Sequence, residues 1–211
     1  MSIEIWSDVV CPWCYIGKRR FEAAAEQLRD EVDLQIVYRP YQLDPTAPPT
    51  PSPAREAYAK KFGGPEQAHA IFDKVTEVAA GEGLEFRMDL AQRANTLAAH
   101  RLLWLAEATG QQQVLKERLL RAYFTEGRDI SSHDTLAELA AEVGMPADNV
   151  RAYLASNDGT AQVRQWLDTA HEEGITAVPT YVLEGKWAIP GAQDTDTFVR
   201  VIRKLLAAEP A

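Results

Sequence analysis

The sequence predicts an α/β fold in which a βαβ unit and an αββα unit are separated by a large all-α insertion. Three observations indicate this fold: a strand, helix, strand pattern opens the chain, helical periodicity fills its middle, and β-rich sequence returns near its end. With 211 residues and 46% hydrophobic content, the chain can bury a sizeable core. We therefore expect a first half of the α/β domain (residues 1–44), a helical insertion domain (45–157) and a second half of the α/β domain (158–211).

The first half contains the strand, helix and strand of a parallel unit. The segment from Ile3 to Trp6 has the pattern of a short strand, a helix runs from about Pro12 to Arg29, and Leu34 to Tyr41 is rich in residues that favour strands. The helix carries one apolar stripe, formed by Cys14, Gly17, Phe21, Ala24, Ala25 and Leu28. We expect this stripe to face the core.

A proline-rich link and a block of helices follow. The link is expected to be extended and stiff, and its prolines are Pro45, Pro48, Pro49, Pro51 and Pro53. Breaks that contain glycine then separate the predicted helices of the insertion, which are Ala54–Phe62, Pro65–Ala80, Asn95–Thr109, Gln112–Tyr123, His133–Val143 and Ala147–Ser156. Charged positions of these helices, such as Lys116, Glu117, Arg118 and Arg121, are expected on solvated faces.

The second half returns to mixed structure. A helix is predicted over Thr160–Glu173, two strands over Thr180–Leu183 and Trp187–Ile189, and a last helix over Asp194–Leu206. The strands are joined by a short turn that contains Gly185. This order completes the αββα unit.

The motif Cys11-Pro12-Trp13-Cys14 contains both cysteines of the chain and lies where the first strand gives way to the first helix. We expect Cys11 to be the N-cap, with Pro12 as the first helical residue. The free N–H groups and the positive end of the helix dipole would then lower the pKa of the Cys11 thiol and make it a nucleophile. Helical phasing buries Cys14 and leaves Cys11 accessible, so Cys14 is expected to resolve what Cys11 attacks.

Two other uses of the cysteines are weighed against this one. A zinc site would need two more ligands, and the four histidines are scattered singly. An inert disulfide would close too small a loop to stabilise the fold much. A redox-active dithiol is the interpretation that we favour. Asp8, three residues before Cys11, could assist proton removal from Cys14, but a turn or capping role is the simpler expectation.

Composition restricts the partners and the compartment. The formal net charge of −9 and the absence of a basic stripe argue against nucleic acid. The first eight residues lack the features of a secretion signal and no later stretch is long enough to span a bilayer, so we expect no membrane contact and a cytoplasmic location. Thiols there are kept reduced, which favours a catalytic or metal-binding role for a close cysteine pair.

Several motifs together resemble a known family. The C-P-W-C after the first strand, the split βαβ and αββα halves, and Val178-Pro179 before the returning strand resemble the thioredoxin superfamily. Further motifs are similar to FrnE-like proteins of the DsbA family, and these are Trp6-Ser7-Asp8, Tyr15-Ile16-Gly17, Arg39 to Leu43, Asn95 to Arg101, and Pro190 to Gln193. The resemblance covers nearly the whole chain. It implies a thioredoxin-like fold with a helical insertion.

The resemblance also implies roles for residues outside the motif. In thioredoxin-like folds the proline at the position of Pro179 is cis and lies beside the dithiol, and the residue before it, here Val178, pairs with an extended substrate through its backbone. We expect a cis Val178-Pro179 bond in contact with Cys11, and a substrate-binding surface formed by Pro12, Trp13, Val178 and Pro179. Trp13 is expected to be an exposed wall of this surface.

Two further functions compete with disulfide exchange by a DsbA-type oxidoreductase. Kappa-class glutathione transferases and 2-hydroxychromene-2-carboxylate isomerases resemble this architecture, but they typically place a lone serine at the position of Cys11. Disulfide exchange requires no cofactor. Glutathione, if it is a co-substrate, would bind near Asn95, His100, Gln193 and Asp194. A redox-sensing or chaperone-like binding module is the third alternative.

The predicted partners follow from these functions. They are a protein or small molecule that carries a disulfide or thiol, and a recycling thiol system that the sequence does not identify. The direction of electron flow stays open, and no metal is expected in the site. The excess of apolar stripes on the helices of the insertion also admits a homodimer.

Overall fold

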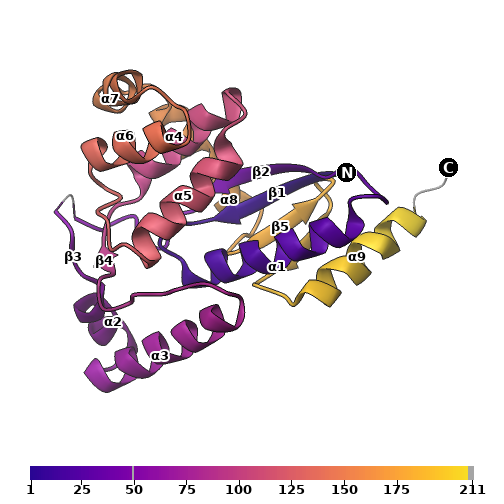
Figure 1. Ribbon diagram of the computed structural model, residues 1–211, viewed down its shortest axis with the longest axis horizontal. Helices are drawn as coiled ribbons and strands as arrows, with labels where there is room; N and C mark the ends of the chain where they lie inside the picture. Colours follow the sequence, from indigo (N-terminus) through magenta and orange to yellow (C-terminus); the bar gives the residue numbers. More distant parts are fainter. Residues whose placement is uncertain (49, 209–211) are drawn as a thin grey trace.

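The fold is described from a computed structural model, which covers residues 1–48 and 50–208. Four strands form a mixed sheet in the order β2-β1-β5-β6, with β1 (Ser2–Ser7), β2 (Gln35–Pro40), β5 (Thr180–Leu183) and β6 (Trp187–Pro190). Strands β1 and β2 are parallel, whereas β1 and β5, and β5 and β6, are antiparallel. The predicted α/β fold and its βαβ and αββα units are confirmed (Figure 1).

Helices cover both faces of this sheet. Helices α1 (Pro12–Leu28) and α9 (Thr195–Ala208) lie side by side on one face (Figure 1), and α8 (Thr160–Glu172) contacts the sheet from the other. Side chains of β1 alternate between the two faces of the sheet. Ile3 and Ile5 pack in the core beneath α1 and α9, whereas Trp6 contacts Trp166 of α8, with ring centroids 5.9 Å apart.

The segment between β2 and α8 is mostly helical. Its helices are α2 (Ala54–Phe62), α3 (Pro65–Gly81), α4 (Leu97–Ala108), α5 (Gln112–Phe124), α6 (His133–Glu142) and α7 (Ala147–Ala155). It also contains an antiparallel pair of two-residue strands, β3 (Ser52–Pro53) and β4 (Gln92–Arg93), which the sequence analysis did not predict. Strands of two residues are too short to show the alternation of apolar and polar residues that identifies a strand in a sequence. The predicted link runs into β3, and its Pro49 lies outside the described residues.

The insertion has its own core, and the start of α1 belongs to it. Val9, Tyr15 and Ile16 pack in the same apolar cluster as the buried faces of α3, α4 and α5. The ring of Tyr15 is stacked on Phe86, with centroids 5.9 Å apart. Helix α1 therefore begins at the junction between the sheet and the insertion, at the end of the sheet that faces the insertion (Figure 1).

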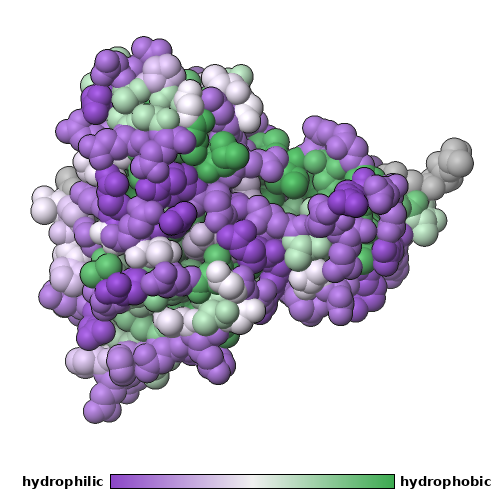
Figure 2. Space-filling view, viewed as in Figure 1, coloured by the Kyte–Doolittle hydropathy of each residue, from purple (hydrophilic) through white to green (hydrophobic). Residues whose placement is uncertain are grey.

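A side chain of the insertion closes the outer edge of the sheet. The side-chain amide of Gln112, at the start of α5, accepts a hydrogen bond from the Tyr38 N–H (2.8 Å) and donates one to the Tyr38 carbonyl (3.0 Å). This pairing satisfies backbone groups that an edge strand otherwise exposes. Figure 2 shows a mostly hydrophilic face with hydrophobic side chains gathered in the hollow between the insertion and the sheet. Within the described residues, no helix is long and apolar enough to cross a bilayer.

Candidate active site

The cysteine motif lies at the N-terminus of α1 as predicted. Cys11 is the N-cap, with an extended backbone (φ −89°, ψ 114°), and Pro12 is the first helical residue. The N–H of Cys14 donates to the carbonyl of Cys11 (3.0 Å), so Cys14 lies in the first turn. Both cysteines are free thiols.

Both thiols are buried, which corrects the expectation that Cys11 stays accessible. Cys11 and Cys14 are each only 3% exposed. Cys11 is covered because its thiol lies against the segment that precedes β5, where it donates to the carbonyl of Val178 over 3.6 Å. Pro12 is also buried, whereas Trp13 is 38% exposed and forms the outer part of the motif.

The Val178-Pro179 peptide bond is cis, and the carbonyl oxygen of Val178 contacts the Cys11 thiol. The predicted cis bond in contact with Cys11 is therefore confirmed. The segment is held in place by its own bonds, since Gly191 donates its N–H to the Pro179 carbonyl over 2.7 Å. It also approaches α1 closely at Gly17. A Cβ atom on Gly17 would lie 3.1 Å from Pro179 Cγ and 2.7 Å from the Tyr181 hydroxyl, so this helix position has no room for a side chain.

The two thiols ionise as a pair, because each changes the charge that the other faces. The hydrogen bond with Cys14, together with burial, raises the pKa of Cys11 well above its ordinary value. Burial also opposes ionisation of Cys14, but the hydrogen bond from Cys11 and the positive charge of Lys116 lower the pKa of Cys14. In this reduced arrangement the contact between the two sulfurs favours a thiolate on Cys14 over one on Cys11.

Lys116 of α5 contributes to the site although we expected it on a solvated face. Its side chain is 1% exposed, and burial lowers the pKa of its ammonium to about 8. The sequence does contain a signal for this burial, because Lys116 belongs to an i, i+4, i+7, i+8, i+11 stripe whose members are all buried. That stripe consists of Gln112, Lys116, Leu119, Leu120 and Tyr123.

Asp8 holds the loop before the motif. Its carboxylate is fully buried and accepts hydrogen bonds from the Val9 N–H (2.8 Å) and the Leu43 N–H (2.8 Å). The Nε2 of His100 lies 3.1 Å from the same carboxylate and 2.9 Å from the Tyr41 carbonyl. Because both neighbours are acceptors, Nε2 carries the proton. Asp8 therefore stabilises the turn before the motif, which is the simpler of its two expected roles.

The other predicted glutathione ligands lie in two different places. His100 is 2% exposed, so its ring is used inside the protein. Asn95 donates to the Ala47 carbonyl (3.2 Å) and accepts from the Leu97 N–H (3.0 Å), which joins the link to α4. Gln193 donates to the Pro190 carbonyl and Asp194 accepts from the Thr197 N–H at the start of α9, each over 2.7 Å. The structure therefore does not gather these four residues around one point.

A cavity of about 540 Å³ adjoins the motif on the side of the insertion. Val10, the residue before Cys11, lines it. Burial, with smaller contributions from the negative charges of Cys11 and Asp8, raises the pKa of Tyr58 in its wall to about 12. The polar and charged side chains that line the cavity are Asp44, Ser52, Glu56, Tyr58, Lys60, Lys61, Gln92, Arg93 and Tyr123. A volume of this size suits a small molecule or the side chains of a peptide.

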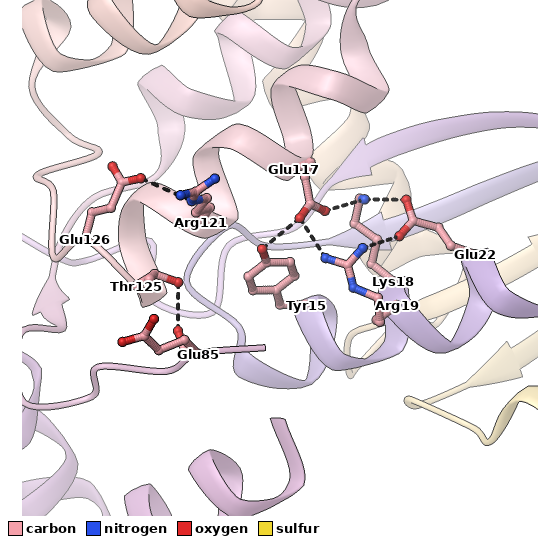
Figure 3. Close-up of polar contacts among 9 residues, drawn as sticks. All are labelled: Tyr15, Lys18, Arg19, Glu22, Glu85, Glu117, Arg121, Thr125 and Glu126. Carbon is pink, nitrogen blue, oxygen red and sulfur yellow. Dashed lines mark hydrogen bonds and ion pairs between the residues drawn. The ribbon is translucent and has the colours of Figure 1, made fainter. Parts of the chain in front are cut away.

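An ion cluster joins the active-site helix to the insertion (Figure 3). The carboxylate of Glu117, on α5, accepts hydrogen bonds from the Tyr15 hydroxyl (2.8 Å), the Lys18 ammonium and the Arg19 guanidinium (2.8 Å), all on α1. Lys18 and Arg19 also contact Glu22. We call these five residues the α1–α5 clamp. Within residues 1–48 and 50–208, no group of three or more His, Cys, Asp or Glu side chains is arranged to hold a metal ion.

Comparisons with known proteins agree with this geometry. Residues 2–203 match the DSBA-like thioredoxin domain family. The sequence is 29% identical over 204 residues to the protein YwbO of Bacillus subtilis, covering 96% of each chain. The structure is similar to a probable DsbA oxidoreductase from Streptomyces coelicolor, with a TM-score of 0.93 and 33% identity, covering 100% of this chain and 92% of that one.

A more distant structural neighbour shares the fold. It is the cytosolic disulfide reductase DsbM from Pseudomonas aeruginosa, solved with GSH, with a TM-score of 0.68 and 20% identity. The similarity covers 98% of this chain and 100% of DsbM.

Proposed function

Because this chain belongs to the DSBA-like thioredoxin domain family, we propose that it is a thiol:disulfide oxidoreductase that works through Cys11 and Cys14. One observation carries the proposal. The reduced pair lies at the N-terminus of α1 with the Cys11 thiol against the Val178 carbonyl, where an extended substrate can bring its own sulfur beside Cys11. The likeness to a probable DsbA oxidoreductase at 33% identity supports the same chemistry.

The reaction begins when the Cys11 thiol loses its proton. The Cys11 thiolate attacks one sulfur of the substrate disulfide, a mixed disulfide forms, and the expelled substrate sulfur takes up a proton. Cys14 then loses its proton and attacks Cys11, which forms the Cys11–Cys14 disulfide and releases the second substrate thiol. The substrate is reduced and the protein oxidised, and the same steps in reverse oxidise a dithiol substrate.

The substrate surface that we propose has two parts. The first part lies beside Cys11, where a peptide would rest on Trp13 and Val178, with Pro12 and Pro179 buried beneath them. The cavity beside Val10 offers space for the side chains of that peptide or for a small disulfide. We place the reaction in the cytoplasm, in keeping with the cytosolic disulfide reductase among the structural neighbours.

The two cysteines are the only ones in the chain, which makes a test of this function direct. Wild-type protein should reduce insulin or oxidise a reduced test protein, and Cys11→Ser should abolish this activity. Cys14→Ser should accumulate a mixed disulfide at Cys11, visible by mass as one bound substrate per chain. A Cys14→Ser variant that turns over at the wild-type rate and traps nothing would contradict the proposal.

The cavity beside Val10 supports a second candidate, which is a glutathione-dependent isomerase or transferase. Lys60 and Lys61 line the cavity and could receive the carboxylates of glutathione, and the neighbour DsbM has been solved with GSH. The same variant separates the two functions. Under the second function the sulfur that reacts belongs to glutathione, so Cys11→Ser should keep its turnover in a glutathione-dependent isomerisation while wild type exchanges no disulfides.

A further inference from the structure

Several buried polar side chains lack a hydrogen-bond partner. In residues 1–48 and 50–208, four buried side-chain nitrogen or oxygen atoms have none, and these are Trp6 Nε1, Ser7 Oγ, Lys116 Nζ and Tyr181 Oη. Two of them act on the ionisation of Cys14, and a third lies against the same helix. The Ser7 hydroxyl and the Lys116 charge both favour its thiolate, and the Tyr181 hydroxyl lies against Gly17, one helical turn after Cys14.

All three groups can donate, so what they lack is an acceptor. A buried donor without a partner costs free energy, and proteins rarely keep several of them in one place. A thiol is a weak acceptor, whereas a thiolate is an anion and a strong one. The surroundings of Cys14 therefore suit the thiolate better than the thiol.

Lys116 is the only one of the three that can also change its charge near neutral pH. Its ammonium lies 5.4 Å from the centre of the Tyr38 ring and has no hydrogen-bond partner among the described residues. The negative charges of Cys14, Asp8 and Cys11 raise the pKa of Lys116, with Cys14 the strongest, and the positive charge of Lys18 lowers it. The other titratable groups that share a cavity wall with Lys116 are Tyr38 and Arg39 of β2 and His100 and Glu107 of α4.

We infer that Lys116 is the positioning residue that controls the protonation of Cys14, taking the Cys14 proton when Cys14 attacks and facing the resulting thiolate as an ammonium ion. This inference rests on the proposed disulfide exchange. It gives the helical insertion a part in the chemistry, because Lys116 belongs to α5. Glu117, the next residue, fixes α5 on α1 through the α1–α5 clamp.

The proton balance of the exchange follows from this arrangement. Each exchange moves two protons, because Cys11 and Cys14 each lose one and the two substrate sulfurs each gain one. When Cys11 attacks, the expelled substrate sulfur takes up the proton that Cys11 gives up. In the mixed disulfide neither cysteine is charged, so burial favours Lys116 as a neutral amine. Cys14 then gives its proton to Lys116 and attacks Cys11, and the second substrate sulfur leaves with that proton.

The decisive experiment measures the ionisation of Cys14 without a substrate. In the Cys11→Ser background Cys14 is the sole thiol, so thiolate absorbance at 240 nm between pH 5 and 9.5 reports its pKa. We expect Lys116→Met to raise the pKa of Cys14 by about one pH unit or more, and Lys116→Arg to restore most of the difference. Lys116→Gln is a second neutral variant should the Met side chain disturb folding.

Lys18→Met is the matched control, because it removes another buried ammonium that the clamp carboxylates already neutralise. It should shift the titration of Cys14 far less than Lys116→Met does. In the otherwise wild-type protein, Lys116→Met should slow the resolution of the mixed disulfide at pH 7 about tenfold and move its pH profile upward. A Cys14 titration that is the same with Lys, Met and Gln at position 116 would overturn the inference. Because the titration needs no disulfide substrate, its result stands even if the protein proves to exchange none.

Discussion

The two sides of the junction between α1 and α5 each bury a lysine, but they treat it differently. Lys18 is 4% exposed and contacts two carboxylates, Glu22 and Glu117. Lys116 is 1% exposed and has no hydrogen-bond partner among the described residues, and the negative charges that act on it most are those of Cys14, Asp8 and Cys11. The residues 116 and 117 are adjacent in α5, so a single helical turn supplies both the unneutralised ammonium and the carboxylate that neutralises the other lysine.

The difference indicates what each side is for. A buried ion that is fully paired holds two elements in register, and its removal leaves a partner charge without compensation. A buried ion without a pair lowers stability, and such groups are kept mainly where chemistry needs a shifted pKa. The Lys18 side of the junction is therefore expected to stabilise the fold, and the Lys116 side to lower its stability while serving the dithiol.

The largest effect should come from Glu117→Ala. This variant removes the acceptor of Tyr15, Lys18 and Arg19 together, and it leaves the buried Lys18 with one exposed partner. We expect the free energy of unfolding in urea at pH 7 to fall by about 3 kcal/mol. Glu138→Ala is the control, since Glu138 is 57% exposed and pairs with Arg128 alone, and its loss should cost less than about 0.5 kcal/mol.

The effect of Glu117→Ala should also depend on pH. Burial opposes ionisation of Glu117, but the hydrogen bond and charge of Lys18 lower the pKa of its carboxyl below the ordinary 4.5. A lowered folded-state pKa means that the contribution is complete above pH 4.5 and is lost as the pH falls through the folded value. The difference in the free energy of unfolding between Glu117→Ala and wild type should therefore shrink below about pH 4. An equal difference at pH 3 and pH 7 would show that the clamp is not electrostatic.

Lys116→Met should have the opposite sign and a smaller size. Replacing a buried ammonium by an apolar side chain of similar length removes a desolvation cost, so we expect unfolding of the reduced protein at pH 7 to require about 1 to 3 kcal/mol more. The pKa of Lys116 is lowered from 10.5 to about 8 in the fold, so the unfolded chain holds its proton to higher pH. The wild type regains stability as the pH rises from 8 towards 10.5, and the gain of the variant should fade over that range.

A loss of stability in Lys116→Met at pH 7 would remove the contrast between the two lysines. Lys116 would then be a structural residue like Lys18. Urea unfolding curves of wild type, Lys116→Met and Lys18→Met, recorded at pH 7 and pH 9.5 with both cysteines reduced, distinguish these outcomes. Of the two variants, only Lys116→Met should be more stable than wild type.

The comparison also explains which parts of the site could be predicted from sequence. Cys11 as N-cap and Pro12 as first helical residue follow from local rules at a helix start, and strand β5 was predicted with its observed bounds, Thr180–Leu183. The cis Val178-Pro179 bond was expected from family resemblance. These features depend on a few neighbouring residues or on a motif that recurs, so the chain itself contains enough information.

The features that the sequence analysis missed all depend on contacts between distant segments. Burial of Cys11 depends on Val178, 167 residues away, and the buried state of Lys116 depends on how α5 is set against α1. The contact between Asp8 and His100 spans 92 residues. A lysine on an amphipathic helix is normally solvated, so only its place on the apolar stripe with Gln112 hints at its burial.

The smallest effect should come from Glu22→Gln, which removes the other carboxylate of the clamp. Glu22 is 44% exposed, whereas Glu117 is 31% exposed and also accepts from Tyr15, so water already screens the attraction between Glu22 and Lys18. We expect a loss of about 0.5 to 1 kcal/mol at low salt, reduced further in 1 M NaCl. A double-mutant cycle with Glu117→Ala measures how far the two carboxylates depend on each other. If Glu22→Gln costs as much as Glu117→Ala, Lys18 is held equally by both helices, and the clamp between α1 and α5 is no stronger than the bond within α1.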